Sequence, residues 1–276
     1  MTDFIWRAGQ FQSLVVQGVT LEACCWGRPP SQAPTLVLLH EGLGCIALWR
    51  DFPQKLAAAT KCGVFAWSRA GYGGSDACAL PRPLDYMSVE AATMVPQVLE
   101  RVGVRSHVLI GHSDGASIAA LHAGGTTDPR LRGLVLVAPH FFAEPLGLAA
   151  IAEARRAYET GDLRARLAKY HRHVDAAFRG WNDAWLDPGF ANWNIQACLS
   201  TIKVPILAIQ GTEDQYGTPA QLDCIATACP AAVKIALLAD CRHAPFFDKA
   251  ETTLDLLTQF TAQLGLDGAG TPSEAP

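Results

Sequence analysis

The hydrophobic residues of the chain fall into short continuous runs that alternate with longer stretches of helical periodicity. Runs this short and uniformly apolar are typical of strands buried on both faces of a sheet. Two earlier runs alternate instead, which predicts an antiparallel hairpin around Gly18. The repeated strand–loop–helix order predicts an α/β fold, a mostly parallel sheet flanked by helices. The predicted strands are Phe11–Val16, Thr20–Trp26, Thr35–His40, Val64–Trp67, Ser106–Ile110, Leu134–Val137, Val204–Ile209 and Val233–Leu238, and the predicted helices between them are Leu48–Thr60, Val89–Val102, Thr218–Ala228 and Phe246–Leu264.

The alternation stops after Pro139 and resumes at Val204. Residues 140–200 contain only helical patterns, Leu148–Glu159 and Leu163–Phe178, and aromatic residues crowd their second half. We therefore expect an α/β core of residues 1–139 and 201–264 with a helical insertion of residues 140–200. Residues 265–276 are rich in Gly, Pro, Ser and Thr, and we expect a disordered tail there.

Composition narrows the class of protein. A net charge of −4 without a Lys/Arg block disfavours nucleic acid and anionic membranes as partners. No apolar window is long enough to span a membrane, and no signal-peptide pattern opens the chain. Nine Cys without Cys-x-x-Cys spacing predict reduced thiols in a cytoplasmic protein. His171-x-His173 is expected at the surface, and we expect neither a metal nor a cofactor.

The strongest chemical motif is Gly111-His112-Ser113-Asp114-Gly115, which lies between an apolar run and an Ala-rich helical segment. A strand, a sharp turn carrying serine and a helix together form a nucleophile elbow. The strained turn needs small neighbours, which Gly111 and Gly115 provide. Ser113 is therefore the candidate nucleophile. The alternative is that the motif is a Gly-rich strand-to-helix turn with no catalytic role.

A serine hydroxyl needs a base, and that base needs an acid to orient it. Asp214 follows one predicted strand and His243 follows the next, at the ends where sites collect in parallel sheets. We predict that Ser113, Asp214 and His243 form a catalytic triad. Glu213 is the alternative acid, and a helix cap or a structural loop histidine is the alternative role for Asp214 or His243.

Two backbone N–H groups are also needed to bind the oxyanion of the tetrahedral intermediate. Asp114 should donate one, and the loop after His40 should donate the other through Gly42 or Leu43. His40 is expected to hold this loop by hydrogen bonds, and His112 to support the site rather than act as base. The carboxylates of Asp114 and Glu41 should face away from the oxyanion or be paired.

These motifs resemble those of the α/β-hydrolase superfamily, and the resemblance covers nearly the whole chain outside the tail. Within it the chain looks like capped bacterial serine esterases, a group that also holds enol-lactonases and carbon–carbon bond hydrolases. The resemblance implies an α/β-hydrolase fold with residues 140–200 as a helical cap. The residues at 112, 114 and 116 depart from the patterns usual in the two narrower classes. The motifs are His40-Glu41-Gly42-Leu43-Gly44, Ser68–Ser75, Gly111–Gly115, Gly211-Thr212-Glu213-Asp214 and His243–Phe247.

The resulting hypothesis is a serine hydrolase that cleaves small carboxylic esters with neutral, apolar acyl groups through an acyl-enzyme. Cleavage of a carbon–carbon bond or a lactone is the alternative, and a ligand-binding protein that lost the chemistry is a third possibility. Substrate contacts are expected from Phe141, Trp181, Trp185 and Phe246, although these aromatics could equally pack the core of the insertion. The sequence leaves the oligomeric state open.

Overall fold

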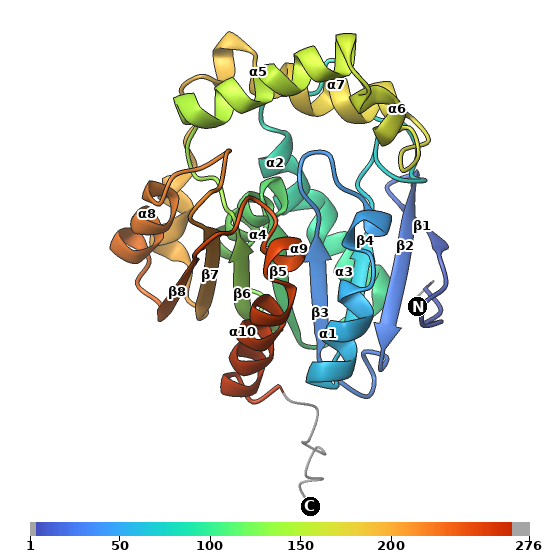
Figure 1. The fold of residues 1–276 in the computed structure, drawn as a ribbon. Coiled ribbons are helices and arrows are strands. Elements are labelled where there is room, and N and C mark those ends of the chain that lie inside the picture. The colour runs from blue at the N-terminus through green and yellow to red at the C-terminus, as the bar shows by residue number, and fades with distance from the viewer. Residues whose placement is uncertain (1–3, 267–276) are drawn as a thin grey trace, which may run out of the picture.

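A computed structural model describes residues 4–266 of the 276-residue chain. Its eight strands form one sheet in the order β1-β2-β4-β3-β5-β6-β7-β8 (Figure 1). β2 runs antiparallel to β1 and β4, and all the other neighbouring strands are parallel. This confirms the predicted fold class. The strands are β1 (Gln12–Val16), β2 (Val19–Gly27), β3 (Thr35–Leu39), β4 (Gly63–Trp67), β5 (His107–His112), β6 (Leu131–Val137), β7 (Ile206–Gly211) and β8 (Val233–Leu238).

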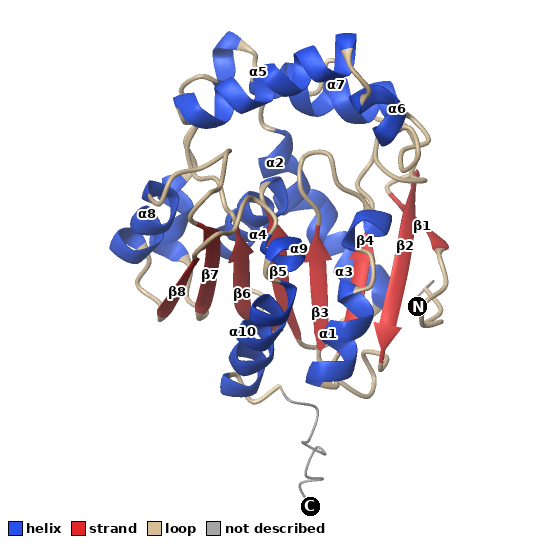
Figure 2. Cartoon of the chain, viewed as in Figure 1, coloured by secondary structure: helices blue, strands red, loops and turns tan. Residues whose placement is uncertain are grey.

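The central strands are buried on both faces, as their continuous apolar runs require. Every residue of β3, β4, β5 and β7 is buried. Their side chains pack into one hydrophobic cluster on each side of the sheet. Helices cover both faces (Figure 2). The edge strand β8 leaves Ile235 and Leu237 exposed, so only the interior of the sheet is fully sandwiched.

The helices follow from their apolar spacing. In α3, Val95, Val98, Leu99 and Val102 recur at helical spacing and are buried, and Gly103 ends the helix in the left-handed conformation. Five residues of π-helix precede this helix. The core helices are α1 (Phe52–Thr60), α2 (Tyr86–Val89), α3 (Val95–Val102), α4 (Asp114–Gly125), α8 (Ala220–Ala228), α9 (Pro245–Asp248) and α10 (Ala250–Gln263).

Three helices lie together above the carboxyl ends of the parallel strands (Figure 1). They are α5 (Pro145–Thr160), α6 (Leu163–Leu167) and α7 (Val174–Trp185). The chain leaves and re-enters the core at one place, where Phe142 and Asn194 form an isolated antiparallel bridge. The predicted helix over residues 163–178 is wrong as a single element, because it breaks between α6 and α7.

The start of the predicted tail packs against the core. Leu266 is buried, and its carbonyl oxygen accepts a hydrogen bond from the Cys62 thiol. The predicted disordered tail of residues 265–276 is therefore wrong for its first two residues. The rest of that tail lies outside the described residues. None of the helices between residues 4 and 266 combines the length and apolar character needed to cross a membrane.

Candidate active site

Ser113 lies on the tight turn between β5 and α4. Its backbone has φ 53° and ψ −119°, a conformation that is strained for any residue with a side chain. The turn is held from the sheet, where the Ser113 N–H donates to the Val137 carbonyl at 2.9 Å. The hydroxyl is thereby fixed above the carboxyl end of β5, at the start of α4. This is the elbow that the sequence predicts.

The two flanking glycines are required by close backbone contacts. A Cβ on Gly111 would overlap the carbonyl of Gly115, and a Cβ on Gly115 would overlap the carbonyl of Leu39. Glycine at both positions lets α4 approach β3 and β5 closely. The motif therefore has a packing reason besides its chemistry.

The His243 ring is oriented by Asp214. His243 Nδ1 lies 2.7 Å from Asp214 Oδ1, which also accepts the Tyr216 N–H at 2.9 Å. The other carboxylate oxygen accepts the Gln210 side-chain amide at 3.2 Å. Burial opposes ionisation of Asp214, but the hydrogen bond and charge of His243 hold the pKa of that carboxyl below its usual value. An ionised Asp214 directs Nδ1–H toward itself and leaves Nε2 as the proton acceptor.

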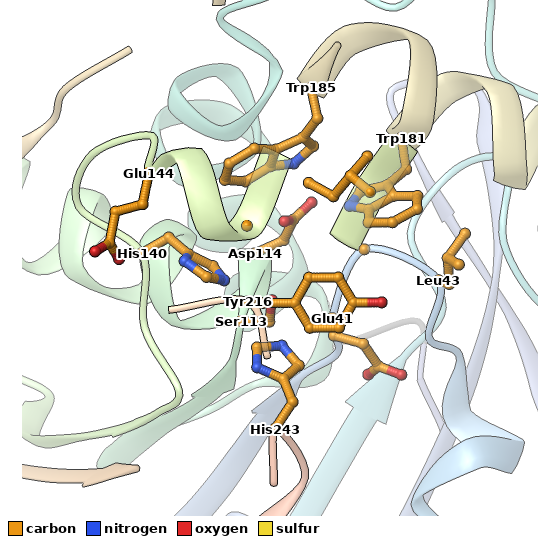
Figure 3. A pocket seen from close by; sticks show the side chains of 13 residues that line it. Glu41, Leu43, Ser113, Asp114, His140, Glu144, Trp181, Trp185, Tyr216 and His243 are labelled. Atoms are coloured by element: carbon orange, nitrogen blue, oxygen red, sulfur yellow. The ribbon is translucent and has the colours of Figure 1, made fainter. Parts of the chain in front are cut away.

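Ser113 and His243 line the same pocket, as Figure 3 shows. Within residues 4–266 the serine hydroxyl has no hydrogen bond to the imidazole. Such bonds are often long before substrate binds, so the arrangement is compatible with proton transfer during catalysis. Glu213, the alternative acid, is exposed and has no contact with the ring among the described interactions.

The loop after β3 is held from behind by His40 and Arg69. His40 Nε2 accepts the Arg69 N–H at 3.0 Å, so Nδ1 carries the proton and donates to the Glu41 carbonyl at 2.7 Å. The Arg69 guanidinium donates to the carbonyl oxygens of both His40 and Glu41. Burial lowers the pKa of His40, which keeps this ring neutral. The predicted hydrogen-bonding role of His40 is confirmed.

This loop brings Gly42 and Leu43 to the pocket opposite the start of α4. No hydrogen bond among the described residues uses the N–H of Gly42 or Leu43. The N–H of Asp114, in the first turn of α4, lacks a partner within the helix. These three N–H groups are the candidates for binding an oxyanion at Ser113. The geometry does not favour Gly42 over Leu43, and the choice between them stays open.

His112 supports His243 rather than replacing it. Its Nε2 lies 2.8 Å from the His243 carbonyl oxygen, and its Nδ1 lies 3.4 Å from Glu41 Oε2. Burial works against the ionised form of Glu41, but His112 holds the pKa of that carboxyl below its usual value. The His243 carbonyl requires a proton on Nε2, so Nδ1 donates to the Glu41 carboxylate only when both ring nitrogens of His112 carry protons.

Thirteen residues line the pocket above Ser113, which has an empty volume of about 510 Å³, open space at its mouth included. Side chains from the core and from α5 and α7 meet there (Figure 3). The lining residues are Glu41, Gly42, Leu43, Ser113, Asp114, His140, Glu144, Gly147, Ile151, Trp181, Trp185, Tyr216 and His243.

Two of the four aromatic residues expected to contact substrate do line this pocket. Trp181 and Trp185 project into it from α7 (Figure 3). Phe141 is wholly buried in the hydrophobic cluster below the pocket. Phe246 packs against Trp49 with ring centroids 4.8 Å apart, in the other cluster. The predictions for Phe141 and Phe246 are therefore wrong, because both side chains turn into the core.

His140 and Tyr216 are pocket residues that sequence reasoning missed. The His140 ring stacks on His243 with centroids 5.7 Å apart, and the Tyr216 ring lies 4.7 Å from the same imidazole. Burial and the neighbouring His243 lower the pKa of His140 to about 3, so this ring is neutral. Both residues lie in the loops that follow the carboxyl ends of parallel strands, His140 after β6 and Tyr216 after β7, and that position is the signal that could have indicated them.

His171 was also placed wrongly. It is buried between α6 and α7, not exposed on a helix. Its Nδ1 accepts the Gly73 N–H at 3.0 Å, and its Nε2 lies 3.0 Å from the Leu43 carbonyl. The break in the helix lets this ring reach into the core.

Comparisons with known proteins agree with the geometry. A model of the alpha/beta hydrolase family matches residues 36–256. No curated protein matches the chain. A putative aryl esterase from Burkholderia cenocepacia is 20% identical, with a TM-score of 0.71 over 92% of this chain and 99% of that chain. The enol-lactonase from Burkholderia xenovorans LB400 is 20% identical, with a TM-score of 0.70 over 91% of this chain and 100% of that chain.

The meta-cleavage product hydrolase from Pseudomonas fluorescens IP01 is 18% identical, with a TM-score of 0.71 over 91% of this chain and 97% of that chain. At these identities the likeness shows the fold alone. The family match covers most of the chain, from β3 into α10, and includes all three candidate triad positions. The chain belongs to the alpha/beta hydrolase family.

Proposed function

We propose that this hydrolase cleaves small carboxylic esters through an acyl-enzyme on Ser113. The observation that carries the proposal is the Asp214–His243 pair, with 2.7 Å between Oδ1 and Nδ1, whose imidazole lines one pocket with a serine on a strained elbow. The hydrolase family supports a small-molecule substrate. We further propose that residues 140–200 act as a cap, since α5 and α7 contribute walls of the pocket.

In the proposed reaction Ser113 Oγ attacks the ester carbonyl carbon while His243 Nε2 takes the hydroxyl proton. The N–H of Asp114 and that of Gly42 or Leu43 bind the resulting oxyanion. The tetrahedral intermediate expels the alcohol, which leaves with the proton from His243. Water then attacks the acyl-enzyme in the same way, giving the carboxylic acid and restoring the Ser113 hydroxyl.

The charges around the pocket favour a neutral acyl group. Three carboxylates line it, and none of its thirteen lining residues is Lys or Arg. Four arginines of residues 140–200, and Arg242 next to His243, form ion pairs with other carboxylates: Arg155 with Asp183, Arg156 with Glu153, Arg164 with Asp175, Arg166 with Asp162 and Arg242 with Asp248. An anionic acyl group would therefore meet like charges, and no Lys or Arg among the lining residues would contact it. The apolar surfaces of Trp181, Trp185 and Ile151 favour hydrocarbon.

A hydrolysis screen tests the proposal. p-Nitrophenyl esters of increasing acyl length are compared with lactones and with vinylogous diketones, whose hydrolysis breaks a carbon–carbon bond. We expect the esters to be turned over with a burst of one p-nitrophenol per active site where deacylation is slow. Turnover of lactones or diketones without ester hydrolysis would replace the proposal with the corresponding alternative. The cytoplasmic location expected from the sequence stays a prediction.

A further inference from the structure

The Tyr216 hydroxyl opens into the pocket and has no protein partner. Tyr216 is partly exposed and lines the pocket above Ser113. No group within residues 4–266 hydrogen-bonds its hydroxyl, whereas the Tyr86 hydroxyl is held by a carboxylate. The Tyr72 hydroxyl also lacks a partner, but it is enclosed by protein, and the Tyr216 hydroxyl is not. An open polar group in a pocket is a candidate contact for a ligand.

The Tyr216 hydroxyl is a protonated donor in a fixed position. Burial and the charge of Asp214 raise the pKa of Tyr216, so the O–H group is intact at neutral pH. The Tyr216 N–H donates to Asp214 Oδ1 at 2.9 Å. The Tyr216 carbonyl packs against Gly147 of α5, where a Cβ would lie 2.4 Å from the carbonyl oxygen. The triad acid and the start of α5 thus hold this residue, which lowers the cost of ordering it around a ligand.

The carboxylates of the pocket do not pair with this donor. Glu144 accepts three hydrogen bonds from other residues, and Asp114 accepts one from a different tyrosine. Glu41 lies 3.4 Å from a ring nitrogen of His112. Among the described residues none of these carboxylates hydrogen-bonds the Tyr216 hydroxyl, so this donor is left for a ligand.

The position of Tyr216 indicates which part of the substrate it can reach. Its ring centroid lies 4.7 Å from that of His243, the proposed base. His243 must protonate the leaving oxygen, so the alcohol part of the ester lies beside this imidazole. In Figure 3 the indoles of Trp181 and Trp185 lie on the other side of Ser113 from His243. The alcohol part therefore passes Tyr216, while the acyl part extends toward the indoles.

We propose that the Tyr216 hydroxyl donates a hydrogen bond to an oxygen atom in the alcohol part of the substrate, beyond the ester oxygen. The proposal rests on ester hydrolysis at Ser113 as described above, and it names the substrate class as esters of alkoxy- or hydroxy-substituted alcohols. Hydrocarbon laid over the hydroxyl would leave this donor unpaired, which disfavours simple alkyl alcohols. An oxygen at the same place restores the hydrogen bond.

Isosteric esters test the proposal in the wild-type enzyme. An ether oxygen replaces a methylene with little change in size, and it accepts but cannot donate. Butyl acetate is compared with 2-methoxyethyl acetate, and pentyl acetate with 3-methoxypropyl acetate. Methyl pentanoate and methyl 3-methoxypropanoate form a pair in which the oxygen lies in the acyl part. Each kcat/KM is divided by the rate of hydroxide-catalysed hydrolysis of the same ester, which removes differences in intrinsic reactivity.

We expect at least one ether in the alcohol part to exceed its alkyl partner by about threefold or more, as a neutral hydrogen bond allows. The ether in the acyl part should not exceed methyl pentanoate. Alkyl esters that equal or exceed both alcohol-part ethers would overturn the proposal. A gain confined to the acyl-part ether would also overturn it.

The Tyr216→Phe variant tests the residue directly, because it keeps the ring beside His243 and removes only the hydroxyl. The preference for the alcohol-part ether should disappear, whereas a purely structural role of the hydroxyl would slow both esters of a pair equally. Tyr170→Phe is the matched control, since Tyr170 is exposed and lines no part of the pocket. This control should keep the wild-type ratio, and an unchanged ratio in Tyr216→Phe would contradict the proposal.

Binding without turnover separates this proposal from the proposed function. Titration of Ser113→Ala with the same esters, followed by tryptophan fluorescence, measures affinity alone. Tighter binding of an alcohol-part ether than of its alkyl partner, lost when Tyr216→Phe is added, supports the Tyr216 contact even if the wild-type enzyme hydrolyses no ester. Hydrolysis of the esters without such selectivity, in rate or in binding, supports the proposed function and rejects the Tyr216 contact.

Discussion

His171 hydrogen-bonds the carbonyl oxygen of Leu43, with 3.0 Å between Nε2 and that oxygen. The Gly73 N–H donates to His171 Nδ1, so the proton must be on Nε2, which donates to Leu43. A ring from the segment between α6 and α7 therefore fixes the loop proposed to bind the oxyanion. His171 is a positioning residue in this account, because it acts through Leu43 and lines no part of the pocket.

Replacing His171 with Phe should disturb this loop. Phe keeps an aromatic ring against Tyr72, whose centroid lies 5.9 Å away, but removes both hydrogen bonds. We expect kcat to fall about tenfold with a smaller change in KM, less than the loss from deleting an oxyanion donor outright. Steady-state kinetics measure the split. His173→Phe is the matched control and should stay near wild type, and equal effects of the two changes would argue against a role for Leu43.

The acid of the triad can be identified by amide substitution. Asp214→Asn keeps the shape but loses the charge that fixes the tautomer of His243, so kcat should fall by several orders of magnitude. Glu213→Gln alters an exposed side chain and should stay within about threefold of wild type. Kinetics on one ester with both variants decide between the carboxylates. The reverse order of effects would assign the acid role to Glu213.

Stability should fall as the solution becomes acidic. Burial lowers the pKa of five buried histidines: His40, His107, His122, His140 and His171. The folded state keeps these rings neutral, whereas the unfolded chain protonates them below their ordinary pKa of 6.5. The free energy of unfolding should therefore decrease as pH falls from 7 to 5. Urea titrations at both values measure it, and a constant value would contradict the neutral assignments.

His107 provides the sharpest single test of that pH dependence. It is fully buried in β5, neither ring nitrogen has a partner in the described structure, and burial lowers its pKa to about 4. His107→Leu fills the same space without a group that must stay unprotonated. The loss of stability between pH 7 and pH 5 should shrink by about 2 kcal/mol in this variant. An unchanged pH dependence would mean that His107 titrates normally in the folded protein.

Acyl charge should affect turnover strongly. Three carboxylates line the pocket and no Lys or Arg does, so a p-nitrophenyl butyrate should have a higher kcat/KM than the matching hemisuccinate. One like-charge contact at short range costs a few kcal/mol at an effective dielectric of about 20, which sets the expected scale. Measurement at two salt concentrations checks that the difference is electrostatic. A faster hemisuccinate would show that an arginine reaches the substrate.

The sequence predicted most of the framework of the fold. Continuous apolar runs mark buried parallel strands, so the sheet and the ends that carry Ser113, Asp214 and His243 could be located from pattern alone. The elbow was clear because Gly111 and Gly115 have a specific steric role. The triad candidates directly follow motifs and strands that are recognised from neighbouring residues in the sequence. This is why these residues could be predicted without the structure.

The direction of individual side chains was not predictable. Phe141 and Phe246 are near the site in sequence, yet both side chains are buried in the core clusters. Phe141 lies in the loop after β6 and Phe246 in the short helix α9, and the neighbouring residues do not indicate which way such a side chain turns. The helical pattern around His171 predicts an exposed position, and only the break between α6 and α7 lets the ring reach Leu43. The Asp114 carboxylate accepts from Tyr86 of α2, and the Tyr86 hydroxyl accepts in turn from Trp185 of α7, so this chain of contacts joins residues that are distant in the sequence.

Covalent labelling identifies the nucleophile directly. A fluorophosphonate probe reacts only with an activated serine, so we expect one adduct per molecule, mapped by peptide mass spectrometry to Ser113. Ser113→Ala should take up no probe and retain less than about a thousandth of the wild-type kcat on esters while unfolding at a similar temperature. Labelling at another serine, or a folded Ser113→Ala variant with more than about a tenth of wild-type turnover, would contradict Ser113 as the nucleophile.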